Sequence, residues 1–443
     1  MIQIITATGD AFESPEITRL LRAQLSNEGL PKVIAGLRQW SLPKGFKFLV
    51  RDDMTIVEPA LMYLREKCLV RGRIQTVGNT QKAYCEDLYE WWMWLGEVGT
   101  NWDQVDSEDI VRYRDALLQS FSPHTHRRYK TKTIRRRLST ILGLYDWAYR
   151  GRLMPINIDR REIRNWPNPN TVVSELLPRV TDEELIRPMN NQDLLRVLML
   201  LGARSPALGE IRTDTRPVRD RLVATVQVTT GMRIDEVLSL TIYQILDLRP
   251  RTDDPAELVK LRIVKTKGLR PRIVSMPSYV LSALHWYIDH EREEALKKAR
   301  SVRLTPVNTV GTTALFVNGV EANNRDVGKP LRSSNFMSVF DRGVRGAGLV
   351  HQALHRDPET GIDSMKPVTN HSSHDLRHTF AVQHYHSLKR HGDPAPWRKI
   401  QVLLGHQHSS TTMDIYLRSV EVDEARITDA MSAVYKQWHN DSA

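Results

Sequence analysis

A proline-rich stretch in the middle of the chain does most to limit the folds that this sequence can adopt. Pro155, Pro167, Pro169 and Pro178 all fall in it, with polar residues between them. Each proline fixes φ and removes a backbone donor, so neither a helix nor a central strand can run through this stretch. We therefore predict a linker at 155–180 that separates two domains, as a chain of 443 residues would allow.

The part before the linker has the apolar period of helices. Tyr84, Leu88, Trp91 and Leu95 recur at helical spacing, which predicts a helix with one buried face. We expect 57–154 to form a helical domain. Residues 1–56 are predicted to be an N-terminal extension, and their sequence does not indicate a role.

The last helix of this domain is strongly basic. Between 127 and 152 there are nine Lys or Arg residues and a single acid, Asp146. A solvated helix face usually mixes both signs, so this imbalance favours contact with phosphates, without sequence readout. Its apolar stripe is predicted to consist of Ile134, Leu138, Ile141, Tyr145 and Ala148. The residues that we expect to contact DNA are Arg127, Arg128, Lys130, Lys132, Arg135, Arg136 and Arg137.

Composition excludes several classes of protein. The net charge of +11 favours a polyanionic partner, and no apolar run approaches the roughly 20 residues that span a bilayer. The N-terminus does not resemble a signal peptide, so we expect a cytoplasmic protein. Cys68 and Cys85 cannot form a disulfide framework, and no histidine has acidic or cysteine partners at metal-ligand spacing. We therefore predict no metal site.

The second domain, predicted at 181–443, contains two basic motifs. In Thr230-Gly-Met-Arg-Ile-Asp-Glu236, glycine permits a turn and Arg233 stands at the start of a helix, where it could bind an anion or pair with a carboxylate such as Glu236. Segments 258–264 and 271–276 alternate as in a β-hairpin, with a basic turn between them. Lys267 in that turn could donate a proton to a leaving alkoxide, and Lys265 is the alternative proton donor.

Three further motifs follow near the C-terminus. They are His374-Asp-Leu-Arg377, Leu404-Gly-His406 and Thr411-Thr-Met-Asp-Ile-Tyr416. His374 and Arg377 are three residues apart, so on a helix they would share one face and reach the same phosphate.

With these motifs in this order, the chain resembles the tyrosine recombinase (phage integrase) family. The resemblance implies that Tyr416 is the nucleophile, Arg233 and Arg377 bind the scissile phosphate, His374 and His406 assist, and Lys267 protonates the leaving 5′-oxygen. His406 and Tyr416 are ten positions apart, one more than is common in the family. Residues 350–370 form a polar insertion before His374 that the family pattern does not account for.

The resemblance also predicts the fold and the partners. The fold would be mainly α, with a helical core-binding (SAM-like) domain and a mixed α+β catalytic domain that carries a small β-hairpin. The protein would be a site-specific recombinase that integrates, excises or resolves a phage or mobile element through a 3′-phosphotyrosyl bond, without a cofactor. Partners would be double-stranded DNA, three further copies in a homotetramer, and accessory DNA-bending or directionality proteins on the bacterial nucleoid.

Two alternative functions and the role of one C-terminal segment remain open at this point. A type IB topoisomerase would use the same chemistry, and a non-catalytic DNA-binding regulator could use the same scaffold. The amphipathic segment 420–438 could dock on a neighbouring subunit or pack on its own domain.

Overall fold

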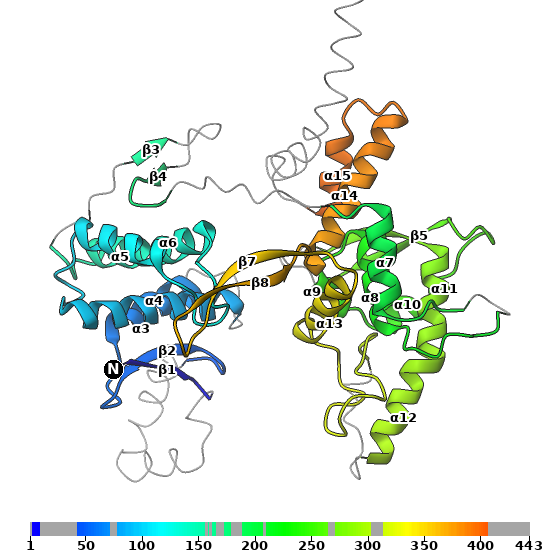
Figure 1. The fold of residues 1–443 in the computed structure, drawn as a ribbon, viewed down its shortest axis with the longest axis horizontal. Helices are drawn as coiled ribbons and strands as arrows, with labels where there is room; N and C mark the ends of the chain where they lie inside the picture. Colours follow the sequence, from blue (N-terminus) through cyan, green and yellow to red (C-terminus); the bar gives the residue numbers. More distant parts are fainter. Residues whose placement is uncertain are drawn as a thin grey trace, which may run out of the picture. The chain divides into compact units, whose positions relative to one another are not determined.

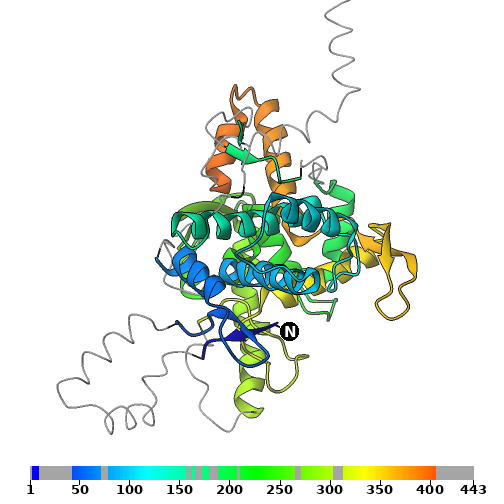
Figure 2. The same cartoon turned by 90° about the vertical axis from the view of Figure 1, so that its left-hand side faces the viewer.

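The computed structural model describes residues 2–8, 42–70, 78–155, 158, 162–164, 172–178, 188–206, 210–264, 271–302 and 313–405. The chain divides into two compact units, drawn in Figures 1 and 2. Unit 1 is Met1–Glu183 with Leu354–Ser364, and unit 2 is Glu184–Ala353 with Met365–Ala443. Helices predominate among the described residues, and each sheet there has two strands. The prediction of a mainly α fold with small sheets is confirmed.

Unit 1 is a helical domain with a β-ribbon on one side of it. Its elements are β1 (Ile2–Thr6), β2 (Lys47–Arg51), α3 (Glu58–Arg65), the π-helix η2 (Glu66–Val70), α4 (Asn79–Val98), α5 (Ser107–Gln119), α6 (Thr131–Arg150), β3 (Glu162–Arg164) and β4 (Val172–Ser174). Strands β1 and β2 are antiparallel, with Ile2 opposite Arg51. The short pair β3–β4 lies within the predicted linker.

The core of unit 1 lies between α4, α5 and α6. Trp91 is fully buried, and its Nε1 donates to the Tyr145 hydroxyl at 3.0 Å. The Tyr113 ring of α5 meets Trp91 edge-on at 4.9 Å. The stripe predicted for α6, from Ile134 to Ala148, is buried throughout, so the helical period was interpreted correctly.

The predicted N-terminal extension needs a correction. Phe46 and Leu49 are completely buried in the same core as α4 and α6, so 42–56 is part of the helical domain. The Gln81 side chain fixes this join, because its Oε1 accepts from the Lys47 N–H at 3.1 Å and its Nε2 donates to the Lys47 carbonyl. Sequence spacing missed the join because β2 is too short to show a clear alternation.

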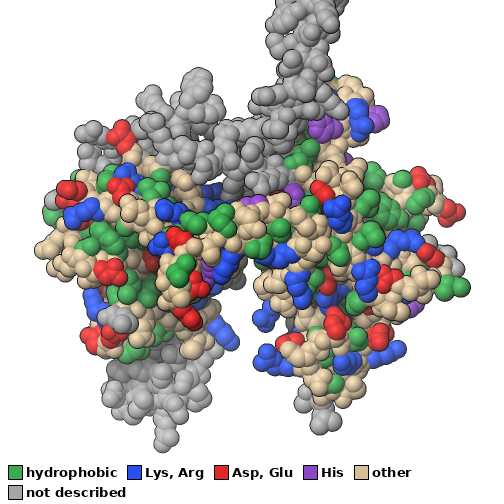
Figure 3. All heavy atoms as spheres, in the orientation of Figure 1, with side chains coloured by type: hydrophobic (Ala, Val, Ile, Leu, Met, Phe, Trp, Pro, Cys, Tyr) green, Lys and Arg blue, Asp and Glu red, His purple; other side chains and the backbone are tan. Residues whose placement is uncertain are grey.

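Unit 2 is mainly helical and also contains two β-hairpins. Its elements are α7 (Asn191–Leu201), α8 (Arg219–Thr230), α9 (Ile234–Leu238), α10 (Tyr243–Leu246), β5 (Leu258–Ile263), β6 (Arg272–Pro277), α11 (Ser278–Tyr287), the π-helix η3 (Ile288–Arg292), α12 (Glu293–Val302), α13 (Ser333–Gly346), β7 (Val350–Arg356), β8 (Asp363–Thr369), α14 (Ser373–Arg390) and α15 (Pro396–Leu404). The hairpin predicted from alternation is therefore present, with Leu258 opposite Pro277. On the face drawn in Figure 3, Lys and Arg side chains are mixed with Asp and Glu over unit 2, as on a solvated surface.

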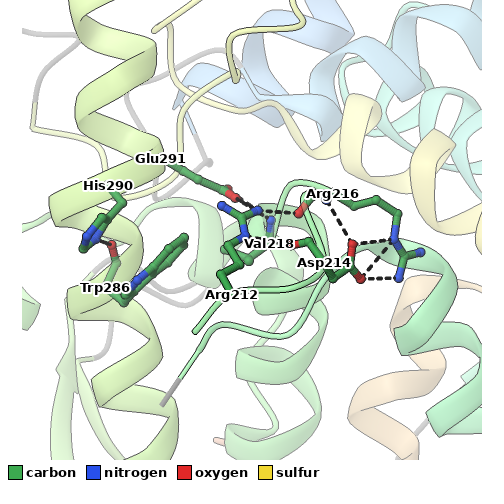
Figure 4. Close-up of polar contacts among 7 residues, drawn as sticks. All are labelled: Arg212, Asp214, Arg216, Val218, Trp286, His290 and Glu291. Atoms are coloured by element: carbon green, nitrogen blue, oxygen red, sulfur yellow. Dashed lines mark hydrogen bonds and ion pairs between the residues drawn. The ribbon is translucent and has the colours of Figure 1, made fainter. Parts of the chain in front are cut away.

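The start of α8 is anchored by Glu291 of η3. Both carboxylate oxygens of Glu291 accept from the Val218 N–H, at 2.8 and 3.1 Å. Figure 4 shows Arg212 beside the same carboxylate, with its guanidinium over the Trp286 ring, 5.2 Å from the centroid. A carboxylate at a helix N-terminus accepts hydrogen bonds from the exposed N–H groups, and its negative charge interacts favourably with the positive end of the helix dipole. This anchoring holds the helix whose other end leads to Arg233.

The polar insertion at 350–370 forms the antiparallel strands β7 and β8 and the turn between them. The tip of this hairpin, Leu354–Ser364, belongs to unit 1. There the Arg356 N–H donates to the His126 carbonyl at 2.8 Å, and the Arg356 guanidinium lies 4.2 Å from the centroid of the Phe121 ring. The predicted catalytic domain therefore contributes a short segment to the helical domain, which the sequence did not indicate.

Candidate active site

Arg233 stands at the N-cap of α9, directly after the turn that ends α8. The turn requires Gly231, whose φ is +66° and whose position leaves no room for a Cβ, which would lie 2.5 Å from the Phe380 ring of α14. The Arg233 N–H donates to Glu236 Oε2 at 2.8 Å, and Nη1 donates to Oε1 at 3.3 Å. The Arg233 side chain remains 29% exposed, so solvent and ligands can reach it.

Glu236 is the buried acid at the centre of this region. Its side chain is 3% exposed, and Arg272 Nη1 and Nη2 donate to its two oxygens at 2.7 Å each. Burial by itself would raise the Glu236 pKa, but the hydrogen bonds from Arg272 and Arg233 outweigh it and lower the pKa. Glu236 is therefore a carboxylate at neutral pH. Of the two roles suggested for Arg233, the ion pair with Glu236 is present.

Arg377 connects three separate segments of unit 2. It lies on α14 and is 1% exposed. Its Nη1 donates to the Gly231 carbonyl at 2.5 Å, and its Nη2 donates to the Leu404 carbonyl at 2.6 Å. Carbonyl oxygens accept these bonds without cancelling the positive charge of the guanidinium. Arg377 thus holds the Arg233 turn against the end of α15, where the Leu-Gly-His motif begins.

His374 lies one turn before Arg377 on the same helix, as the spacing predicted. The helix begins with a capping box in which Ser372 and Asp375 satisfy each other's backbone donors. The His374 side chain is exposed, and its ring meets that of His378 edge-on at 4.7 Å. A basic side chain on the first turn of α14 therefore lies at the surface above the buried Arg377.

The remaining predicted residues lie outside the described part of the chain. These are Lys267, its alternative Lys265, His406, Tyr416 and the terminal segment 420–438. The described chain reaches the edges of both gaps. Arg272 begins β6 five residues after Lys267, and α15 ends at Leu404 with Gly405 in the left-handed conformation, φ +66°.

The basic helix α6 differs from its prediction in one respect. The Arg137 side chain is 10% exposed, and it faces Asp87 and Glu90 of α4 at 4.0 and 3.7 Å. Arg136 also pairs with Asp87, at 2.5 Å, although 42% of the Arg136 side chain is exposed. Counting charges along α6 alone missed the acids of α4, because helices distant in sequence can share charges. Arg137 is a buried ion-pair residue, so it does not face a phosphate on the surface.

The other predicted DNA-contact residues lie nearer the surface of unit 1. Arg128, Lys130, Lys132 and Arg136 have exposed side chains, and Arg127 is half-buried. Arg135 Nη1 donates to the Pro178 carbonyl at 3.2 Å, which ties α6 to the end of the linker. In the described residues, no three His, Cys, Asp or Glu side chains gather as they would around a metal ion. Nor does any described helix combine the length and apolarity needed to span a bilayer.

Comparison with known proteins agrees with the geometry. The phage integrase family matches residues 206–421, and the phage integrase N-terminal SAM-like domain matches residues 74–152. The chain is 27% identical to tyrosine recombinase XerC of Halalkalibacterium halodurans, over 70% of this chain and 77% of the relative. It is 25% identical to tyrosine recombinase XerD of Pseudomonas aeruginosa, over 79% of this chain and 89% of the relative.

Among solved structures, XerH recombinase bound to a palindromic difH substrate matches with a TM-score of 0.48 and 19% identity, covering 80% of this chain and 79% of that one. The integrase of transposon Tn1549 with circular intermediate DNA matches with a TM-score of 0.49 and 15% identity, covering 82% of this chain and 98% of that one.

The chain belongs to the phage integrase family and is a tyrosine recombinase, an enzyme that breaks and rejoins DNA. The predicted family and enzyme class are confirmed.

Proposed function

We propose that this chain is the site-specific recombinase of a phage or mobile element and that it cleaves DNA through a 3′-phosphotyrosyl bond to Tyr416. One observation carries the proposal. Buried Arg377 binds the Gly231 turn and the Leu404 carbonyl together, so the segments bearing Arg233, His374 and the Leu-Gly-His motif converge around one guanidinium. Such convergence suits a phosphate whose developing charge must be stabilised.

In this mechanism the two arginines bind the scissile phosphate. Arg233 and Arg377 each carry a permanent charge and a planar set of donors, which suit the non-bridging oxygens of a pentacoordinate phosphorus. His406 adds a hydrogen bond to a phosphate oxygen. Because Arg233 and Arg377 are held by hydrogen bonds within unit 2 before the substrate arrives, they favour the transition state over the ground state.

Bond making and breaking then balance without an outside reagent. The Tyr416 oxygen forms a bond to phosphorus and gives up its proton, with His374 as the base. A phenol with a pKa near 10 needs this help at neutral pH. The bond from phosphorus to the 5′-oxygen breaks, and Lys267 protonates that oxygen. The phosphotyrosyl ester conserves the energy of the broken phosphodiester bond. A 5′-hydroxyl of another strand can therefore attack the ester and rejoin the DNA without ATP or metal.

Unit 1 would hold the duplex through its phosphates. Arg128, Lys130, Lys132 and Arg136 supply exposed positive charge on and before α6, whereas Arg137 serves the interior. The change Lys132→Gln should weaken binding to all duplexes alike and reduce the salt dependence of the affinity by roughly one phosphate contact.

Four protomers on two sites would exchange strands through a four-way junction, with accessory DNA-bending or directionality proteins setting the direction.

The test captures the covalent intermediate. The full-length protein is incubated, in the presence of a chelator, with nicked duplexes that have a randomised core, and adducts that survive denaturation are sequenced. We expect an adduct that defines the site, disappears in Tyr416→Phe and remains in the control Tyr243→Phe, a tyrosine that is 65% exposed. If the wild type forms no adduct, or if Tyr416→Phe still forms one, the proposal is wrong. If a monomer instead relaxes an arbitrary supercoiled plasmid, the enzyme is a topoisomerase.

A further inference from the structure

Arg272, the first residue of β6, lies at the junction of the segments that meet around Arg377. Its side chain is 12% exposed, and it has no role in the proposed chemistry. Both terminal nitrogens are committed to Glu236, at 2.7 Å each. A buried bidentate pair of this kind fixes the orientation of both partners, because two parallel bonds leave no free rotation.

Glu236 transmits that orientation to Arg233. The oxygen that accepts from Arg272 Nη2 also accepts from the Arg233 N–H at 2.8 Å, and the other oxygen accepts from Arg233 Nη1 at 3.3 Å. Arg233 is the more exposed of the two arginines that face this carboxylate, at 29% against 12%. Without Arg272, Glu236 would lose its two shortest bonds and would be free to rotate away from Arg233.

Arg272 also packs against the end of α15. A Cβ on Gly405 would lie 2.9 Å from Arg272 Cδ and 3.2 Å from its Nη1, so the glycine backbone rests directly on this side chain. The preceding carbonyl, that of Leu404, accepts from Arg377 Nη2. The Arg272 side chain therefore supports two segments. It holds the segment of Arg233 through Glu236, and it holds the end of α15, whose Leu404 carbonyl binds Arg377, through Gly405.

We propose that Arg272 is a positioning residue for DNA cleavage, which orients Arg233 through Glu236 and holds the Gly405 backbone in place. This inference rests on the proposed function, in which Arg233 binds the scissile phosphate. Arg272 touches no reacting atom in this scheme. Its loss should slow cleavage by about 10-fold to 100-fold, the effect of a misplaced catalytic group, and should leave DNA affinity unchanged.

The experiment compares two scissile linkages in the duplex recovered from the adduct selection. One is the natural phosphodiester and the other is a methylphosphonate, which is neutral and needs less stabilisation by a guanidinium. Single-turnover cleavage is measured for the wild type, Arg272→Gln, Arg272→Lys and Arg262→Gln. Arg262 is the matched control because it is an exposed arginine on the paired strand β5, opposite Ile273.

We expect Arg272→Gln to be slow on the phosphodiester and much closer to the wild type on the methylphosphonate, because a misplaced Arg233 matters less there. Arg272→Lys keeps the charge but cannot bind both oxygens, so it should show a smaller deficit with the same substrate preference. The control should match the wild type on both. Melting curves give the folded fraction, and rates are expressed per folded molecule. Wild-type rates in both Arg272 variants, or an equal deficit on the two linkages, would overturn the inference, whereas absence of a wild-type adduct would overturn the proposed function itself.

Discussion

Asp87 of unit 1 and Glu236 of unit 2 are both buried carboxylates that face two arginines, yet their pKa values move in opposite directions. Burial raises the pKa of Asp87 to about 6, although Arg136, Thr140 and Arg137 act against it. The Glu236 pKa is lowered, because hydrogen bonds from Arg272 and Arg233 outweigh burial. The number of nearby arginines is the same, so the number alone does not decide the charge state.

Geometry explains the difference. Both Glu236 oxygens are bound by Arg272 at 2.7 Å, and both also accept from Arg233. For Asp87, Oδ2 receives Arg136 at 2.5 Å and the Thr140 hydroxyl at 2.9 Å, while Oδ1 is buried without a hydrogen-bond partner. A buried charge is stabilised only when its lone pairs are satisfied. Glu236 in unit 2 is therefore charged at neutral pH, whereas Asp87 in unit 1 gains or loses its charge near pH 6.

The largest expected effect comes from neutralising each carboxylate in turn. Glu236→Gln leaves the buried Arg272 guanidinium without its charged partner, which should cost roughly 3–5 kcal/mol of unfolding free energy. Asp87→Asn should cost about 1 kcal/mol, because the Asp87 charge is only partly satisfied. Hydrogen exchange in urea, followed in peptides from α8–β6 and from α4–α6, measures both. Equal losses in the two units would contradict the contrast.

The second prediction concerns pH. The pKa of Asp87 is about 6 in the folded state against 3.8 for a free aspartate side chain, so between these pH values the folded state binds one proton more than the unfolded state. Unit 1 should then lose up to about 3 kcal/mol as pH rises from roughly 4 to 6. The lowered pKa of Glu236 has the opposite sign, since its stabilisation is present above the unfolded value and lost as pH falls. Comparing exchange protection of wild type and Asp87→Asn across this window isolates the effect, and identical pH slopes would refute it.

A smaller effect should follow from Thr140→Val. The Thr140 hydroxyl donates to Asp87 at 2.9 Å, so its loss should cost about 1 kcal/mol and raise the Asp87 pKa further. Thr225→Val in α8 is the control, since the Thr225 hydroxyl donates to a carbonyl of its own helix, that of Arg221. Urea unfolding at neutral pH compares the two variants. A cost no greater than that of the control would show that the Asp87 bond contributes nothing.

The smallest effect is expected at Asp363, which separates geometry from burial. Arg356 binds its two oxygens at 2.7 and 3.0 Å, nearly as Arg272 binds Glu236, but Asp363 is exposed. Solvent and salt screen such a pair, so Asp363→Asn should leave unfolding unchanged at moderate ionic strength. Hydrogen exchange at 354–364 in low and high salt tests this. A large loss that persists in high salt would show that geometry alone suffices.

Many elements of the molecule could be predicted from the sequence because the patterns that indicate them are local. Helical period identified α4 and α6, alternation identified β5 and β6, and the proline-rich stretch indicated the division between two domains. The spacing of His374 and Arg377 placed them on one helix, and Gly231 indicated the turn before Arg233. Each of these features depends on residues within a few positions of one another, so neighbours in sequence carry the information.

Only the tertiary structure decided which charges meet. Arg137 belongs to a basic run in the sequence, yet it is buried against the acids of α4, 47 and 50 positions upstream of it. Arg272 was predicted only as part of a β-hairpin, yet it contacts both Glu236 and Gly405, and the tip of the 350–370 hairpin belongs to unit 1. Side-chain charge is a property of composition, but the pKa and the role of a charged group depend on desolvation and on partners that folding brings from far along the chain.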